Sequence, residues 1–93
     1  MAKKIQNRAV SIEHMTPAAL ASMLTGAKKL VVAIDVAKTK MMTGFAREDG
    51  AVVKLVKWTG PRQTRDFIEL VAQTAQLLGV EVEALMGAHG HLR

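Results

Sequence analysis

A single aspartate directly follows the most apolar run of the chain. Residues 30–34 read LVVAI, a continuous run rich in β-branched residues, and Asp35 comes next. Such a run predicts a central strand covered on both faces. A carboxylate fixed at the end of that strand suits Mg²⁺, a cation that prefers a few carboxylate oxygens and water and that promotes phosphodiester cleavage. The alternative is that Asp35 only caps the following turn, as Asp often does.

Four basic residues offer a second kind of chemistry. Lys38 and Lys40 lie just beyond Asp35, and Arg62 and Arg65 lie in the polar stretch that follows residues 51–58. We predict that they contact nucleic-acid phosphates next to the metal ligand. The alternative for each residue is a solvated surface charge with no partner.

Other metal chemistry has little support in the sequence. His89 and His91 are two imidazoles without a third ligand, which is too few for a zinc site. The chain has no cysteine, so thiolate metal sites, disulfides and cysteine nucleophiles are excluded. A cysteine-free chain is typical of a reducing compartment, and we expect a cytoplasmic protein.

Composition indicates one small soluble domain with a polyanionic partner. The chain has 93 residues, is 49% hydrophobic and carries a net charge of +5. Residues 1–65 hold twelve Lys or Arg against four Asp or Glu, so the basic character is concentrated there. Nucleic acid is the commonest partner of such a basic region. The alternative is a solvated, lysine-rich surface without a polyanionic partner. No apolar run approaches the roughly 20 residues of a membrane span.

The elements that must position Asp35 follow from local signals. Thr16 and Pro17 suit the start of a short helix, and Gly26 suits its exit. Strands are predicted at 30–34, 40–47 and 51–58, joined in meander order, with a hairpin at Asp49-Gly50.

A second helix and a fourth strand complete the predicted order. The helix begins near Pro61 or Arg62 and ends at Gly79, and the alternating residues 80–86 form a strand parallel to the first. The expected fold is α/β. Its parts are a flexible basic arm (1–15), a short helix and connector (16–29), the sheet domain (30–86) and a tail (87–93).

Residues 34–38, Ile-Asp-Val-Ala-Lys, match a family motif one for one. Together with the hairpin, the stretch WTGPRQTRDFIELV and the order of elements, they make residues 30–86 resemble the N-terminal segment of the DEDD transposases of bacterial insertion sequences. The opening motif of that family is a hydrophobic strand ending in I-D-V-(A/S)-K. The resemblance implies a RuvC-like, ribonuclease-H-type fold, here incomplete, with four of the five strands.

The resemblance also implies a role for Asp35 and a defect elsewhere. Asp35 would be the first of four acidic Mg²⁺ ligands in an enzyme that cleaves and transfers DNA strands. The resemblance thus implies DNA as the partner, with a guide or structured RNA as a further candidate. The family's Glu follows the fourth strand in a motif near E-P-T-G-T-Y-G, where this chain has Gly87 and the tail GAHGHLR. Inserting one G before suitable codons for that motif yields GAHGHLR. We therefore expect a frameshifted, truncated transposase fragment with no catalysis of its own.

Two other functions stay open. An actin-like ATPase or sugar kinase also ends its first strand in an acid, although residues 36–38 lack the glycine typical of its phosphate-gripping turn. A non-catalytic nucleic-acid-binding module would need only the basic residues. In the incomplete sheet the fourth strand would be an exposed edge, and such edges favour self-association.

Overall fold

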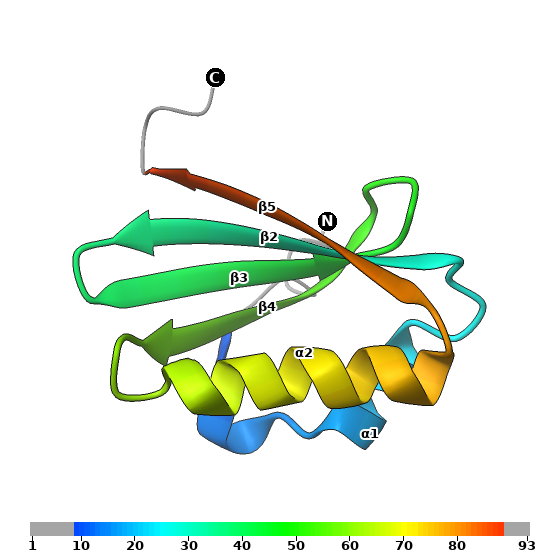
Figure 1. Ribbon diagram of the computed structural model, residues 1–93, viewed down its shortest axis with the longest axis horizontal. Helices are drawn as coiled ribbons and strands as arrows, with labels where there is room; N and C mark the ends of the chain where they lie inside the picture. Colours follow the sequence, from blue (N-terminus) through cyan, green and yellow to red (C-terminus); the bar gives the residue numbers. More distant parts are fainter. Residues whose placement is uncertain (1–8, 89–93) are drawn as a thin grey trace, which may run out of the picture.

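A computed structural model describes residues 9–88 and shows an α/β fold (Figure 1). In chain order the elements are β1 (Val10–Ser11), a 3₁₀ helix η2 (Ile12–His14), α1 (Pro17–Met23), β2 (Lys29–Ala37), β3 (Lys40–Ala46), β4 (Val52–Thr59), α2 (Thr64–Leu78) and β5 (Glu81–Ala88). The strands form one mixed sheet of five, in the order β1-β4-β3-β2-β5. No helix among the described residues is long and apolar enough to cross a bilayer.

The predicted meander is confirmed. Strands β2, β3 and β4 pair antiparallel in sequence order. The β3–β4 hairpin turns at Asp49-Gly50, where Gly50 has φ 87° and the Asp49 carboxylate accepts a hydrogen bond of 2.9 Å from the backbone N–H of Ala51. A positive φ is free of a Cβ clash only for glycine, so the sequence determines this turn locally.

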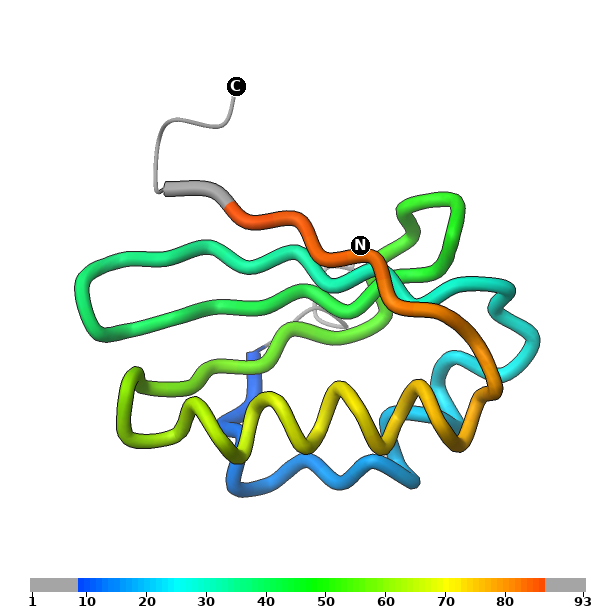
Figure 2. The backbone as a smooth tube through the Cα atoms, in the orientation of Figure 1, coloured from blue at the N-terminus to red at the C-terminus, as the bar shows by residue number. Residues whose placement is uncertain are grey.

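Helix α2 crosses over from β4 to β5, which pairs parallel with β2 as predicted (Figure 2). The helix ends at Gly79, whose left-handed conformation lets its N–H bond to the carbonyls of Ala75 and Gln76. It begins at Thr64, later than predicted, because the preceding residues form a turn in which the Gln63 N–H donates to the Thr59 carbonyl at 2.7 Å.

The N-terminal region differs from prediction. Within the expected arm, residues 1–15, the structure has a short strand that the sequence analysis does not predict: Val10 and Ser11 pair parallel with Val56 and Lys57 of β4. Ile12 anchors this segment with a side chain only 6% exposed. A two-residue pairing has no periodicity, so it leaves no pattern in the sequence. The sheet consequently has five strands instead of the predicted four.

The core lies between α2 and one face of the sheet. Leu30, Val32, Phe45 and Val56 are fully buried there, and the Trp58 ring stacks on Phe67 with centroids 4.3 Å apart. Helix α1, capped by the Thr16 hydroxyl, packs along α2 (Figure 1). We call the sheet face opposite α2 the outer face.

Strand β2 does not have the two-sided burial that its apolar run predicts. Leu30, Val32 and Ile34 are buried under α2, whereas Ala33 and Asp35 on the outer face are exposed. Within residues 9–88 both helices lie along one side of the sheet, so nothing described covers these two side chains (Figure 1).

Candidate functional site

Asp35 lies inside β2, close to its carboxyl end. The strand continues to Ala37, and strand alternation places Ile34 under α2 and Asp35 on the outer face. Its partners in register are Met42 on β3 and Gly87 on β5. Asp35 therefore lies beside the carboxyl end of β5. Its carboxylate is exposed, although the apolar run before it predicts a strand covered on both faces.

The registers of the sheet align one residue from every strand in a single row. In sheet order this row is Ser11, Lys57, Met42, Asp35 and Gly87. Neighbouring strands lie about 4.8 Å apart, so the backbones of Asp35 and Lys57 are roughly 10 Å apart. The row therefore places a hydroxyl, an ammonium group and a carboxylate on one face without pairing the two charges.

A hollow of about 600 Å³ opens around this row. It is lined by Ser11, Asp35, Ala37, Lys40, Met41, Met42, Lys57, Trp58, Thr59 and Gln63. Asp35 is the one carboxylate among these lining residues, and Lys40 and Lys57 are the cations. The two ammonium groups suit a phosphate, and the methionines and neutral polar groups suit a flat ring that carries hydrogen-bonding atoms at its edge. A nucleotide combines both parts.

The hollow offers a metal ion one carboxylate, that of Asp35. Residues 9–88 contain no group of three or more Asp, Glu, His or Cys side chains able to hold a metal ion. Asp35 supplies one carboxylate, and the two lysines of the same hollow oppose a divalent cation.

The predicted phosphate ligands divide into two groups. Lys40 lines the hollow with Asp35, and Lys38 occupies the adjoining β2–β3 turn with φ 55°. Arg62 and Arg65 line a separate depression of about 680 Å³ beside the first turn of α2. A hydrogen bond of 2.9 Å from the Gly60 N–H to the Thr39 carbonyl ties the two regions together.

Lys57 completes this basic region, although no motif in the sequence singles it out. Lys38, Lys40, Lys57, Arg62 and Arg65 gather where the β2–β3 turn meets the β4–α2 loop, at the left in Figure 1; we call this the open end. None of the five forms an ion pair within the described residues. The alternation of β4 does place Lys57 on the face opposite Trp58, but only the registers of β4 with β3 and of β3 with β2 put it in the same row as Asp35.

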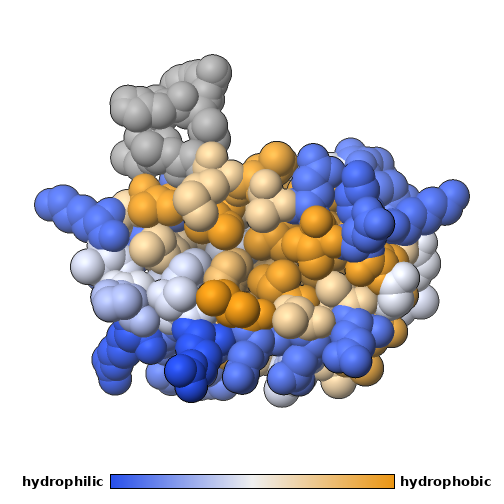
Figure 3. All heavy atoms as spheres, in the orientation of Figure 1, coloured by the Kyte–Doolittle hydropathy of each residue, from blue (hydrophilic) through white to orange (hydrophobic). Residues whose placement is uncertain are grey.

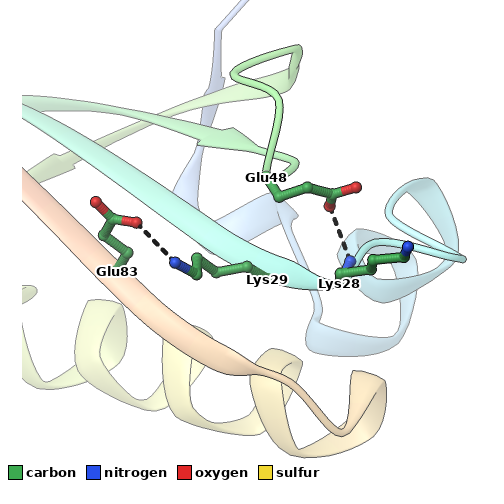
Figure 4. A network of polar contacts seen from close by, with 4 residues as sticks. All are labelled: Lys28, Lys29, Glu48 and Glu83. Carbon is green, nitrogen blue, oxygen red and sulfur yellow. Dashed lines mark hydrogen bonds and ion pairs between the residues drawn. The ribbon is translucent and has the colours of Figure 1, made fainter.

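The opposite end of the sheet uses its charges differently. There the Lys29 ammonium group lies 3.2 Å from the Glu83 carboxylate, and the Glu48 carboxylate accepts a hydrogen bond of 2.8 Å from the Lys28 N–H (Figure 4). The Arg47 guanidinium donates to the Thr25 carbonyl at 2.8 and 3.2 Å. We call this the linked end.

The hydrogen bond from Lys28 lowers the pKa of Glu48 below its ordinary value, with smaller contributions from its own backbone N–H and from the charges of Arg47 and Lys28. Ionised Glu48 is therefore the form that the folded chain favours.

Comparison with protein-family profiles, curated protein sequences and solved structures gives no match for this chain. Most of the predicted tail 87–93, including His89 and His91, lies outside the described residues.

Proposed function

We propose that this chain is the N-terminal part of a ribonuclease-H-type domain of a DEDD transposase, which binds DNA through the outer face and the open end. One observation carries the proposal. Position 87, where the family's Glu is expected, lies in register beside Asp35 and on the same face of the sheet. Two carboxylates at these adjacent positions would form the beginning of a divalent-metal site.

The arrangement of the elements supports the same interpretation. The meander β2–β3–β4, the crossover helix α2 and the parallel placement of β5 beside β2 are those that the resemblance implies. In the intact enzyme, Mg²⁺ would stabilise the charge that develops on the phosphate during strand cleavage. With Gly87 in place of the acid, the chain's own contribution is to bind and orient a strand through its lysines.

The variant Gly87→Glu tests this function. We expect it to bind Mn²⁺, used as a spectroscopic substitute for Mg²⁺, at least tenfold more tightly than the unmodified chain, as measured by electron paramagnetic resonance. Adding Asp35→Asn should abolish the gain, because both carboxylates are needed. Gly87→Gln is the matched control, since it adds similar bulk without charge.

Either of two results would refute the proposed pair of ligands: no gain for Gly87→Glu, or a gain that survives Asp35→Asn. A non-catalytic nucleic-acid-binding module, favoured by the lone acid and the unpaired lysines, predicts such results together with DNA binding that tolerates Asp35→Ala. Restoring the reading frame after Met86 in the gene is an independent check, since it should recover the E-P-T-G-T-Y-G motif.

A further inference from the structure

Strand β5 forms one edge of the sheet and is long. Its eight residues pair with β2 on one side, and the other side has no partner strand within the described residues. The opposite edge, β1, has only two residues. Short edge strands, lysine, proline and bulges are the usual protection against edge-to-edge pairing. Strand β5 has no lysine or proline, and its register with β2 is unbroken from Glu81 to Ala88.

Apolar side chains are exposed along the same edge. Val82, Leu85 and Met86 are 42%, 50% and 67% exposed. A groove of about 280 Å³, lined entirely by apolar residues that include Ile68 of α2 and Ala84 of β5, runs between the two elements. Figure 3 shows this apolar surface between the upper strands and the helix, flanked by hydrophilic residues.

We propose that β5 pairs antiparallel with β5 of a second copy of this chain, about a two-fold axis at Ala84. The axis is perpendicular to the sheet, so the helix-covered faces of both copies lie on the same side and the two sheets become one. Val82 of each copy then lies opposite Met86 of the other, and the apolar groove continues across the junction. Backbone hydrogen bonds along the joined edges add to the apolar contact.

The charges of β5 select this register. Parallel pairing in register, or antiparallel pairing centred on Glu83, places like charges directly opposite each other, which destabilises a sheet. Centring on Ala84 puts Glu83 opposite Leu85, and Lys29 of its own chain already neutralises Glu83 at 3.2 Å. Centring on Leu85 also separates the acids, but it places Val82 opposite Ala88 and so loses the contact with Met86.

The same register changes the outer face. Glu81 of the second copy lies opposite Gly87 and therefore extends the row that contains Asp35. A role of this Glu81 in metal binding rests on the proposed function. The dimer itself does not depend on that function. The tests below measure the oligomeric state alone, so a failure of either proposal is recognisable separately.

The first test is sedimentation velocity of the full chain over a dilution series. We expect a reversible dimer, and we expect Met86→Lys to raise its dissociation constant at least tenfold, because a charged edge opposes pairing. Leu77→Lys is the matched control, since Leu77 is 62% exposed on α2 and does not line the groove. A monomer at all concentrations, or equal effects of both variants, would overturn the proposal.

A second test determines the register. Val82→Lys and Met86→Glu should each weaken the dimer. The double variant should recover most of the affinity, because the lysine introduced at position 82 then faces the glutamate introduced at position 86 of the other copy. Within one chain these positions are about 13 Å apart along the strand, too far to pair with each other. Circular dichroism verifies that each variant folds. Folded variants without recovery in the double variant would rule out pairing about Ala84.

Discussion

The linked end and the open end of the sheet both carry basic residues, but they use them in opposite ways. At the linked end Arg47 holds the carbonyl of Thr25, and Lys29 pairs with Glu83. At the open end the contacts are made by neutral groups, such as the Gly60 N–H with the Thr39 carbonyl and the Thr59 N–H with the Gln63 side chain. The cations there remain available.

This difference separates structural charge from charge that can serve binding. A cation that already has an acceptor gains little from a phosphate, because binding must first break the existing contact. When an unpaired lysine neutralises a phosphate, the counterions condensed on the nucleic acid are released. This release supplies most of the affinity in nonspecific nucleic-acid binding. Loss of charge should therefore affect stability at the linked end and DNA binding at the open end.

The largest expected effect comes from removing the lysines of the open end. In the triple variant Lys38→Gln, Lys40→Gln and Lys57→Gln, affinity for a single-stranded oligonucleotide should fall roughly 100-fold at low salt, with a shallower salt dependence. Fluorescence anisotropy measures both. The melting temperature should hardly change, since none of the three forms an ion pair within the described residues.

The matched control removes the same charge elsewhere. Lys28→Gln, Lys29→Gln and Lys54→Gln together change the net charge equally, and we expect them to weaken binding by no more than a few-fold through the general field. Equal losses of affinity in the two triple variants would mean that net charge alone governs binding. The proposed difference between the open end and the linked end would then be wrong.

Arg47→Gln should have the next largest effect, on stability. The guanidinium makes two hydrogen bonds to one carbonyl and joins the β3–β4 hairpin to the α1–β2 connection. Hydrogen bonds of charged groups contribute about 1.5–3 kcal/mol, and partial exposure reduces this to about 1 kcal/mol. Urea unfolding followed by Trp58 fluorescence measures the loss. Arg47→Lys should recover only part of it, because lysine lacks the forked geometry, and unchanged stability in Arg47→Gln would contradict a structural role.

Lys38→Gly should change stability and DNA affinity in opposite directions at one residue of the open end. Lys38 has φ 55°, a conformation that costs a residue with a Cβ about 1–2 kcal/mol. Glycine removes this cost but loses more chain entropy on folding, so we expect a net gain of roughly 0.5 kcal/mol. DNA affinity should fall a few-fold at the same time. Lys38→Ala, which loses the charge and keeps the strain, should lower affinity without raising stability; a stabilised Lys38→Ala would exclude this explanation.

Much of the sheet follows from local signals in the sequence. The positive φ at Gly50 and Gly79 and the alternation in β4 are properties of a few neighbouring residues, and they suffice to predict the meander and the crossover. Asp35 is identifiable from its place after an apolar run. Its exposure is not, because burial of β2 depends on which elements cover each face.

The remainder of the candidate site depends on contacts between distant segments. Ser11 and Lys57 join the row of Asp35 only through the registers of β1 with β4 and of β4 with β3. The alternation within a strand determines which face each side chain lies on, because a one-residue shift would expose the buried apolar residues. A two-residue shift keeps the face but changes the neighbours, and the pattern of a single strand does not distinguish it. The composition of the hollow therefore required the structure.

The smallest expected effect concerns Glu48 at the linked end and appears in its pH dependence. The hydrogen bond from the Lys28 N–H lowers the pKa of Glu48 in the folded chain. The stabilisation from ionised Glu48 is therefore complete above the ordinary carboxyl pKa of 4.5 that holds in the unfolded chain, and it is lost as the pH falls through the lower pKa of the folded chain. In Glu48→Gln the amide oxygen can still accept that hydrogen bond but cannot titrate. The variant should accordingly be slightly less stable than the unmodified chain at pH 7, and the difference should vanish on acidification. Thermal unfolding of both proteins between pH 7 and pH 3 measures this convergence. A difference that stays constant over that range would show that the charge of Glu48 contributes nothing, and the linked end would then depend on Arg47 and on the Lys29–Glu83 pair alone.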